Sequence, residues 1–174
     1  MIKDKIISLA NIAKPVVELK KLRFFKSREW GEFGGMSADV WINGVKCMEV
    51  IDEGNGGCYN YTSEQTSLAK ANIKLLEHYI KTIPEYNYSE GMDAYFSDLG
   101  VKQYEEKKML KLFEKAICYG VTNGKSYRTA SWKDKTLVQI DKINLQCAYN
   151  EIKKNLKAGE IVFNTNLQKL GINI

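Results

Sequence analysis

The chain has 174 residues, of which 44% are hydrophobic and 11% aromatic. This length predicts a single domain over residues 1–174 with a core large enough to need no disulfide or metal staples, and the composition excludes a disordered chain. No apolar run approaches the length of a membrane span, and Asp4, Lys5 and Lys14 interrupt the N-terminal segment, where a secretory signal would be continuous. We therefore expect a cytoplasmic protein.

The net charge of +5 is unevenly distributed. Residues 1–28 carry eight basic and two acidic residues, residues 29–99 carry four and twelve, and residues 100–174 carry fourteen and seven. Two basic ends thus flank an acidic middle. If the ends meet in the fold, one face would attract phosphate backbones and another a basic protein surface; if the fold interleaves the segments, the asymmetry disappears. The sequence leaves both alternatives open.

The first predicted elements are a short helix over residues 3–13, ended by Pro15, and a strand over residues 16–27. The strand is rich in β-branched and aromatic residues but alternates imperfectly, so we expect a bulge or an edge position. Residues 29–35 predict a turn that contains glycine.

The segment Met36–Gly57 is the most informative part of the chain. Two alternating runs, residues 36–42 and 45–52, flank Asn43-Gly44, a pair that favours a type I′ hairpin because both central residues need φ > 0. Pairing across this turn predicts an apolar face with Ile42 opposite Val45, Val40 opposite Cys47, and Ala38 opposite Glu49. On the other face it predicts Trp41 opposite Lys46, and Asp39 opposite Met48.

Three helices and two further strands follow. Thr62 and Gln65 have capping-box spacing, and an apolar stripe leads from there to Pro84, which ends the first helix. After an irregular acidic segment, helices are predicted from about 102 to 119, with Gly120 after its end, and from about 143 to 157, with strands at residues 126–132 and 160–164. Because strands and helices do not alternate regularly, we expect an α+β fold. It would have an antiparallel sheet with a central Asn-Gly hairpin and three main helices packed mostly on one face.

Catalytic templates fit the chain poorly. His78 is the only histidine, and no C-x-x-C pair accompanies Cys47, Cys58, Cys118 and Cys147, which we expect to be reduced and buried. Residues 120–126, GVTNGKS, are one residue short of a phosphate-binding P-loop and follow a predicted helix where that loop follows a strand.

A metal-dependent nuclease site is the closest catalytic resemblance. Glu18-Leu19-Lys20 matches its E-x-K end, but a second carboxylate is required, and Asp39 and Glu49 are expected on opposite faces of the hairpin. We expect no metal, no cofactor and no enzyme. Glu49 is the carboxylate to test first.

The loop after the hairpin is a candidate ligand loop. It has three glycines in four residues and consists of Asp52, Glu53, Gly54, Asn55, Gly56 and Gly57. Glycines free backbone amides to converge on an anion, whereas the two carboxylates favour a cation. The alternative is a plain connection between strand and helix.

Two stretches mix basic and aromatic residues, KKLRFFKSREW at residues 20–30 and KSYRTASWKDK at residues 125–135. Lysine and arginine neutralise phosphates, and aromatic rings stack on unpaired bases. The candidate residues for binding a partner or a nucleic acid are Lys20, Lys21, Arg23, Phe25, Arg28, Trp30, Lys125, Tyr127 and Arg128. Ordinary amphipathic strands have the same composition, so that alternative remains.

The pieces SADVWINGVKCMEVIDEGNGG, SYRTASW and AGEIVFNTNL span most of the chain. Together they resemble small uncharacterised proteins encoded by bacteriophages and gut-bacterial mobile elements. The resemblance carries no catalytic residues. It implies a small protein that acts in the host bacterial cytoplasm by binding host machinery.

Three functional hypotheses follow. The first is a non-enzymatic binding protein of phage or mobile-element type, such as an anti-defence, anti-CRISPR-like inhibitor that binds a host nuclease or ribonucleoprotein. The second is a nucleotide- or metal-binding module that uses the Asp52–Gly57 loop. The third is direct binding of single-stranded nucleic acid. The sequence does not determine the oligomeric state.

Overall fold

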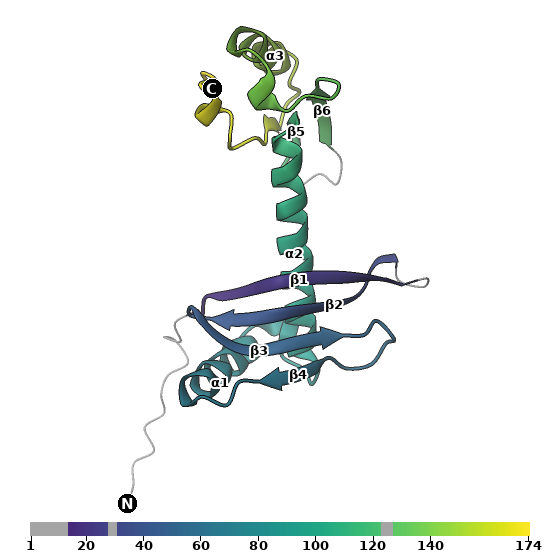
Figure 1. Ribbon diagram of the computed structural model, residues 1–174, viewed down its shortest axis with the longest axis vertical. Helices are drawn as coiled ribbons and strands as arrows, with labels where there is room; N and C mark the ends of the chain where they lie inside the picture. The colour runs from purple at the N-terminus through teal and green to yellow at the C-terminus, as the bar shows by residue number, and fades with distance from the viewer. Residues whose placement is uncertain (1–13, 28–30, 123–126) are drawn as a thin grey trace, which may run out of the picture. The chain divides into compact units, whose positions relative to one another are not determined.

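The computed structural model describes residues 14–27, 31–122 and 127–174, and it divides the chain into two compact units (Figure 1). The first unit is Met1–Tyr104 and the second is Glu105–Ile174. Sequence length predicted one domain; the structure has a separate core in each unit. The helix predicted at residues 3–13 lies outside the described residues.

The α+β class is confirmed, but the strands form two antiparallel sheets instead of one. The first sheet has the order β1-β2-β3-β4 and consists of β1 (Val17–Ser27), β2 (Gly31–Ile42), β3 (Val45–Asp52) and β4 (Asn60–Ser63). It is followed by α1 (Ser67–Lys81), η2 (Pro84–Tyr86) and α2 (Gly91–Phe113), which continues into the second unit. The second sheet has the order β6-β5-β7, with β5 (Ala116–Val121), β6 (Tyr127–Ser131) and β7 (Glu160–Val162); η3 (Leu137–Gln139), α3 (Lys142–Lys154) and η4 (Gln168–Leu170) complete this unit.

The core of the first unit lies between one face of its sheet and the helices (Figure 1). Alternating residues of β2 and β3, such as Val40 and Val50, are fully buried against Leu76 of α1 and Phe96 of α2. Helices therefore cover one face of this sheet, as expected, and its polar face carries the charged side chains described below.

The Asn-Gly hairpin is confirmed. Asn43 and Gly44 have φ of 50° and 79°, the left-handed conformations that a type I′ turn requires. The Asn43 side-chain oxygen accepts a hydrogen bond from the Val16 backbone at 3.0 Å, and the buried Asn72 of α1 donates to the Ile42 carbonyl at 3.2 Å. The turn is thus fixed to both the edge strand and the helix.

The predicted pairing beyond this turn is wrong because β3 contains a bulge. Ile42–Val45 and Trp41–Lys46 pair as expected, but Val40 then faces Met48, which leaves Cys47 as the extra residue. A shift by one residue moves every later side chain to the other face of the strand. Asp39 consequently faces Glu49, Ala38 faces Val50, and Glu49 is exposed instead of lying on the apolar face.

β1 has both features predicted for it. Its register with β2 shifts between Lys20 and Arg23, where Lys21 has a φ of 53°, and β1 lies at one end of the described sheet. The turn predicted at residues 29–35 is wrong for residues 31–35, which belong to β2. Thr62 lies in β4; the cap of α1 is Thr66, which accepts a hydrogen bond from the Ala69 backbone.

The helix predicted up to residue 119 ends at Phe113, and the segment after it is the central strand of the second sheet. The run AICYGV is continuously apolar, a pattern that does not distinguish a buried strand from a helix. Gly120 consequently lies within β5 and not after a helix. α3 and the strands at 126–132 and 160–164 are confirmed within a few residues.

The second unit has its own core, where Ile117 of β5 packs against Leu145, Tyr149 and Ile152 of α3. Asn164 is buried; its side chain accepts from the Cys118 backbone at 2.6 Å and donates to the Ala116 carbonyl at 2.9 Å. All four cysteines are free; two of them are buried and, against expectation, Cys58 and Cys147 are exposed.

Across the described residues, no helix combines the length and the apolar character needed to cross a membrane.

Candidate functional site

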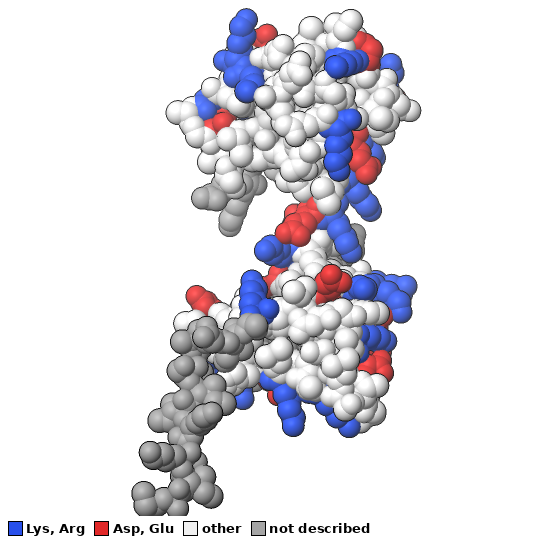
Figure 2. Space-filling view, turned by 90° about the vertical axis from the view of Figure 1, so that its left-hand side faces the viewer, with Lys and Arg blue, Asp and Glu red and all other residues white. Residues whose placement is uncertain are grey.

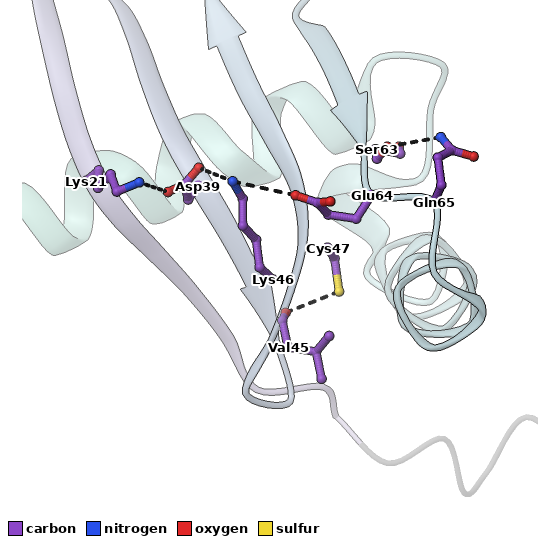
Figure 3. Close-up of polar contacts among 8 residues, drawn as sticks. All are labelled: Lys21, Asp39, Val45, Lys46, Cys47, Ser63, Glu64 and Gln65. Atoms are coloured by element: carbon purple, nitrogen blue, oxygen red, sulfur yellow. Dashed lines mark hydrogen bonds and ion pairs between the residues drawn. The ribbon is translucent and has the colours of Figure 1, made fainter.

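Lys21, one of the basic residues predicted as a binding surface on β1, is held by an ion pair across the sheet (Figure 3). The Lys21 ammonium lies 2.8 Å from one oxygen of Asp39, and the Lys46 ammonium lies 3.0 Å from the other. Lys46 also lies 3.6 Å from Glu64, which follows β4. A series of side chains of alternating charge, Lys21, Asp39, Lys46 and Glu64, therefore connects β1, β2 and β3 with the residue after β4.

Asp39 is the carboxylate that both lysines of this series contact. Its side chain is only 9% exposed, and the hydrogen bonds from Lys21 and then Lys46 lower the pKa of the carboxyl, against the opposing effect of its burial. The carboxylate stays ionised and neutralises the two lysines. The register shift at Cys47 also places Glu49 of β3 opposite Asp39, although Glu49 forms neither of these two contacts.

The other candidate residues of β1 are only partly available to a ligand. Lys20 lies 3.6 Å from Glu18 and 3.7 Å from the centre of the Trp41 ring. Arg23 lines a small hollow of about 210 Å³ together with Asp39 and Glu49, two acidic side chains. Phe25 is 43% exposed. Arg28, Trp30 and Lys125 lie outside the described residues.

Tyr127 and Arg128, the remaining candidates, belong to β6 of the second unit. Tyr127 is exposed, whereas Arg128 forms an ion pair with Glu160 of β7 and lies over the Tyr119 ring of β5, 4.6 Å from its centre. Arg128 therefore spans the three strands of this sheet, and its charge is neutralised within the protein.

The Asp52–Gly57 loop is described in full, and its glycines have local structural reasons. A Cβ on Gly54 would lie 1.7 Å from the Gly34 carbonyl oxygen, and one on Gly35 would lie 2.6 Å from the Asp52 carbonyl oxygen. Two loop amides already donate to side chains of the loop itself, Gly54 to Asp52 at 2.8 Å and Gly57 to Asn55 at 3.4 Å. The loop thus closes on itself and on β2, and its sequence needs no ligand to explain it.

The acidic groups of the described residues are dispersed. No cluster of three or more His, Cys, Asp or Glu side chains that could hold a metal ion occurs among these residues. Asp93 instead accepts hydrogen bonds from the Tyr61 hydroxyl and the Tyr59 backbone, which orders the start of β4 against α2. His78 is exposed on α1.

A different site is present in the second unit, where a hollow of about 670 Å³ lies between the end of α2 and the turn after β6. We call it the Trp132 hollow. Its lining residues are Leu112, Lys115, Ala116, Thr129, Ser131, Trp132, Lys133, Asp134, Lys135 and Thr136.

Local backbone structure positions the basic residues of the Trp132 hollow. Asp134 is left-handed, with a φ of 57°, and the Lys135 amide donates to the Trp132 carbonyl at 3.2 Å, so the chain reverses within four residues. This turn places Lys133 and Lys135 around one hollow with Trp132. Lys115, the second residue after the end of α2, also lines this hollow.

The charges of the Trp132 hollow are not neutralised in the way those of β1 are. Within the described part of the chain, Lys115, Lys133 and Lys135 form no ion pair with an acidic side chain. Asp134 is the single acidic residue of the lining. Three cations therefore share one hollow with one carboxylate.

The two units also differ in total charge. Residues 1–104 contain thirteen basic and fourteen acidic residues, whereas residues 105–174 contain thirteen basic and seven acidic. The acidic middle of the sequence folds with the basic N-terminal strand into a nearly neutral unit, on which Figure 2 shows both signs of charge. The excess positive charge belongs to the second unit, at +6.

Part of this site is visible in the sequence. The basic and aromatic stretch at residues 125–135 contains Trp132, Lys133 and Lys135, but the candidates predicted from it are Lys125, Tyr127 and Arg128. Lys115 was missed because it comes from another segment, and only the β5–β6 pairing brings the two segments together. The one available signal was the run WKDK, in which two lysines closely follow a tryptophan.

Comparison of the chain with protein-family models, curated proteins and solved structures finds no match.

Proposed function

We propose that this chain is a non-enzymatic binding protein whose second unit binds single-stranded nucleic acid at the Trp132 hollow. The observation that carries the proposal is the set of three lysines, Lys115, Lys133 and Lys135, which surround one hollow without acidic partners among the described residues. They belong to a unit with a net charge of +6.

Lysines without acidic partners are free to neutralise phosphates. Each lysine that binds a phosphate releases condensed counterions, which makes the affinity strongly dependent on salt. Lys20 and Lys21 of β1 differ in this respect, because Glu18 and Asp39 already compensate their charges. The hollow is also wide enough for a ligand the size of a nucleotide, since small-molecule sites commonly measure about 300–1,000 Å³.

The proposal is tested by fluorescence anisotropy with a labelled single-stranded oligonucleotide at several salt concentrations. The variant Lys115→Gln/Lys133→Gln/Lys135→Gln should bind weakly. The slope of log affinity against log salt concentration should be smaller in magnitude by about 2, because each lysine paired with a phosphate contributes ~0.7 to that slope. The matched control is Lys142→Gln/Lys154→Gln/Lys169→Gln, which removes the same charge from exposed positions outside the hollow.

The two triple variants separate a site from a general charge effect. The control should retain most of the affinity and the wild-type slope. Equal losses in both variants, or no binding by the folded wild-type chain at low salt, would contradict the proposal.

The resemblance to phage and mobile-element proteins supports a narrower version of this function. In it, the chain acts in the host bacterial cytoplasm as an anti-defence inhibitor and meets a host ribonucleoprotein through its exposed nucleic acid. Retention of such a complex on the immobilised chain should then be lost after nuclease treatment of the lysate. Retention that resists nuclease would favour a direct protein partner instead.

A further inference from the structure

We infer that the Trp132 hollow takes one unstacked nucleotide, with its base on the Trp132 ring and its phosphate among Lys115, Lys133 and Lys135, and that the chain therefore prefers single strands to duplexes. This inference rests on the proposed function and adds the chemical unit that is recognised. It names an aromatic platform in addition to a cluster of charge.

The position of Trp132 suits a fixed platform. Its side chain is partly buried and packs against the core that Ile117 and Leu145 form with α3. The turn that follows is closed by the hydrogen bond from the Lys135 amide to the Trp132 carbonyl. A ring that packs against a core loses little freedom when a base stacks on it.

The rest of the lining matches the other parts of a nucleotide. Leu112 and Ala116 provide an apolar wall, and the exposed Thr129 and Ser131 of β6 provide hydroxyl groups. A base is apolar on its faces, whereas the sugar and phosphate accept hydrogen bonds and carry the negative charge. Hydroxyls, lysines and an aromatic ring in one hollow therefore fit a nucleotide better than they fit an inorganic anion.

A second hollow of the same unit shows why the combination of residue types alone is insufficient. It measures about 330 Å³ and also contains aromatic and basic residues, including Tyr119 and Arg128. There the arginine already lies over the tyrosine ring and is paired with Glu160. Arg128 and Tyr119 thus satisfy one another, and Lys157 is the only further basic residue of that lining, whereas three lysines line the Trp132 hollow.

Preference for single strands follows from the geometry of stacking. In a duplex the faces of the bases are covered by neighbouring base pairs, so a protein ring reaches them only after unstacking. Phosphates, in contrast, are exposed in both forms. Trp132 should thus contribute to single-strand affinity alone, whereas the lysines contribute to both.

The test uses the full chain and two labelled ligands, an oligothymidylate of about 12 nucleotides and a duplex of equal length. Trp132→Leu should weaken single-strand binding ~5- to 150-fold and leave duplex binding and the salt slope unchanged. Trp132→Phe, which keeps an aromatic ring, should retain most of the affinity. Circular dichroism confirms that each variant is folded.

A second measurement covers the case in which Trp132→Leu does not fold. In nitrogen–proton NMR spectra of the wild-type chain, the indole resonance of Trp132 is identified by its loss in Trp132→Phe. It should shift on addition of thymidine monophosphate and stay in place with inorganic phosphate at the same concentration.

The results distinguish failure of base stacking on Trp132 from failure of nucleic-acid binding as a whole. If the wild-type chain binds neither ligand, the proposed function fails. If it binds both with a steep salt dependence but folded Trp132→Leu binds like wild type, or the indole resonance does not respond to the nucleotide, only the stacking inference is overturned.

Discussion

The two units contain the same number of basic residues, thirteen each, and use them differently. In the first unit, Lys21 and Lys46 meet at the nearly buried carboxylate of Asp39, and the ion pairs tie four strands into one sheet. In the second, Lys115, Lys133 and Lys135 surround a hollow with no such partner among the described residues. Lys21 and Lys46 thus stabilise the first unit, whereas Lys115, Lys133 and Lys135 remain available for a ligand in the second.

This comparison shows that partners, and not residue types, decide what a basic stretch can do. KKLRFFKSREW has the richer composition, yet its residues Lys20 and Lys21 have acidic partners.

The largest loss of stability is expected from Gly54→Ala in the loop of the first unit. Gly54 has a left-handed backbone conformation, and its new Cβ would lie 1.7 Å from the Gly34 carbonyl oxygen. The two effects together should lower the free energy of unfolding by about 3–5 kcal/mol. Gly56→Ala is the control, because Gly56 is also left-handed but faces open space, and it should cost about 1–2 kcal/mol. Urea unfolding measures both. Equal effects would show that close packing does not explain the glycines and would reopen a ligand role for the loop.

Asn164→Ala should have the next largest effect, confined to the second unit. It leaves the buried Cys118 amide and the Ala116 carbonyl without their side-chain partner, at a cost of about 2–4 kcal/mol. Asn72→Ala, the corresponding change in the first unit, removes the hydrogen bond donated to the Ile42 carbonyl and a long one accepted from the Asn43 side chain, and should cost about 1–2 kcal/mol. Hydrogen exchange of peptides from each unit locates the losses; deprotection in the wrong unit would contradict these roles.

Asp39→Asn should produce a smaller and pH-dependent loss. Because the two lysines lower the pKa of Asp39 below its ordinary value of 3.8, its ionised form stabilises the fold above that pH, and this contribution disappears as the pH falls through the folded-state pKa. We expect Asp39→Asn to cost about 1–2 kcal/mol at pH 7 and progressively less below pH 3.8. Unfolding curves at several pH values measure the difference. A difference independent of pH would exclude the ionic role.

The smallest effect is expected for Arg128→Gln. An ion pair with an arginine that is 47% exposed contributes about 0.5 kcal/mol, and the variant should bind single strands nearly as well as wild type. A strong loss of affinity would show that Arg128 leaves Glu160 to bind the ligand, and it would enlarge the site beyond the Trp132 hollow.

The sequence predicted the features that local chemistry determines. Asn43-Gly44 indicated its turn because few residue pairs tolerate two left-handed conformations in succession. The imperfect alternation around Lys21 indicated the bulge of β1. The fold class followed from the order of the elements.

What the sequence did not predict depends on the pairing of distant segments. Nothing near Cys47 indicates that it is an extra residue in β3, and that single shift moved Glu49 to the open face beside Asp39. The second sheet was missed because β5 looks like the end of a helix until β6 and β7 pair with it. Lys115 joins the Trp132 hollow only through that pairing.

The different roles of the two sets of basic residues can be separated in one experiment that neutralises each set in turn. The affinity for single-stranded oligonucleotide is measured against salt for Lys20→Gln/Lys21→Gln/Arg23→Gln and for Lys115→Gln/Lys133→Gln/Lys135→Gln. We predict that the first variant is less stable but has the wild-type affinity and salt slope, whereas the second is stable and binds weakly with a slope flatter by about 2. Loss of affinity in the first variant with wild-type binding by the second would contradict this difference in roles.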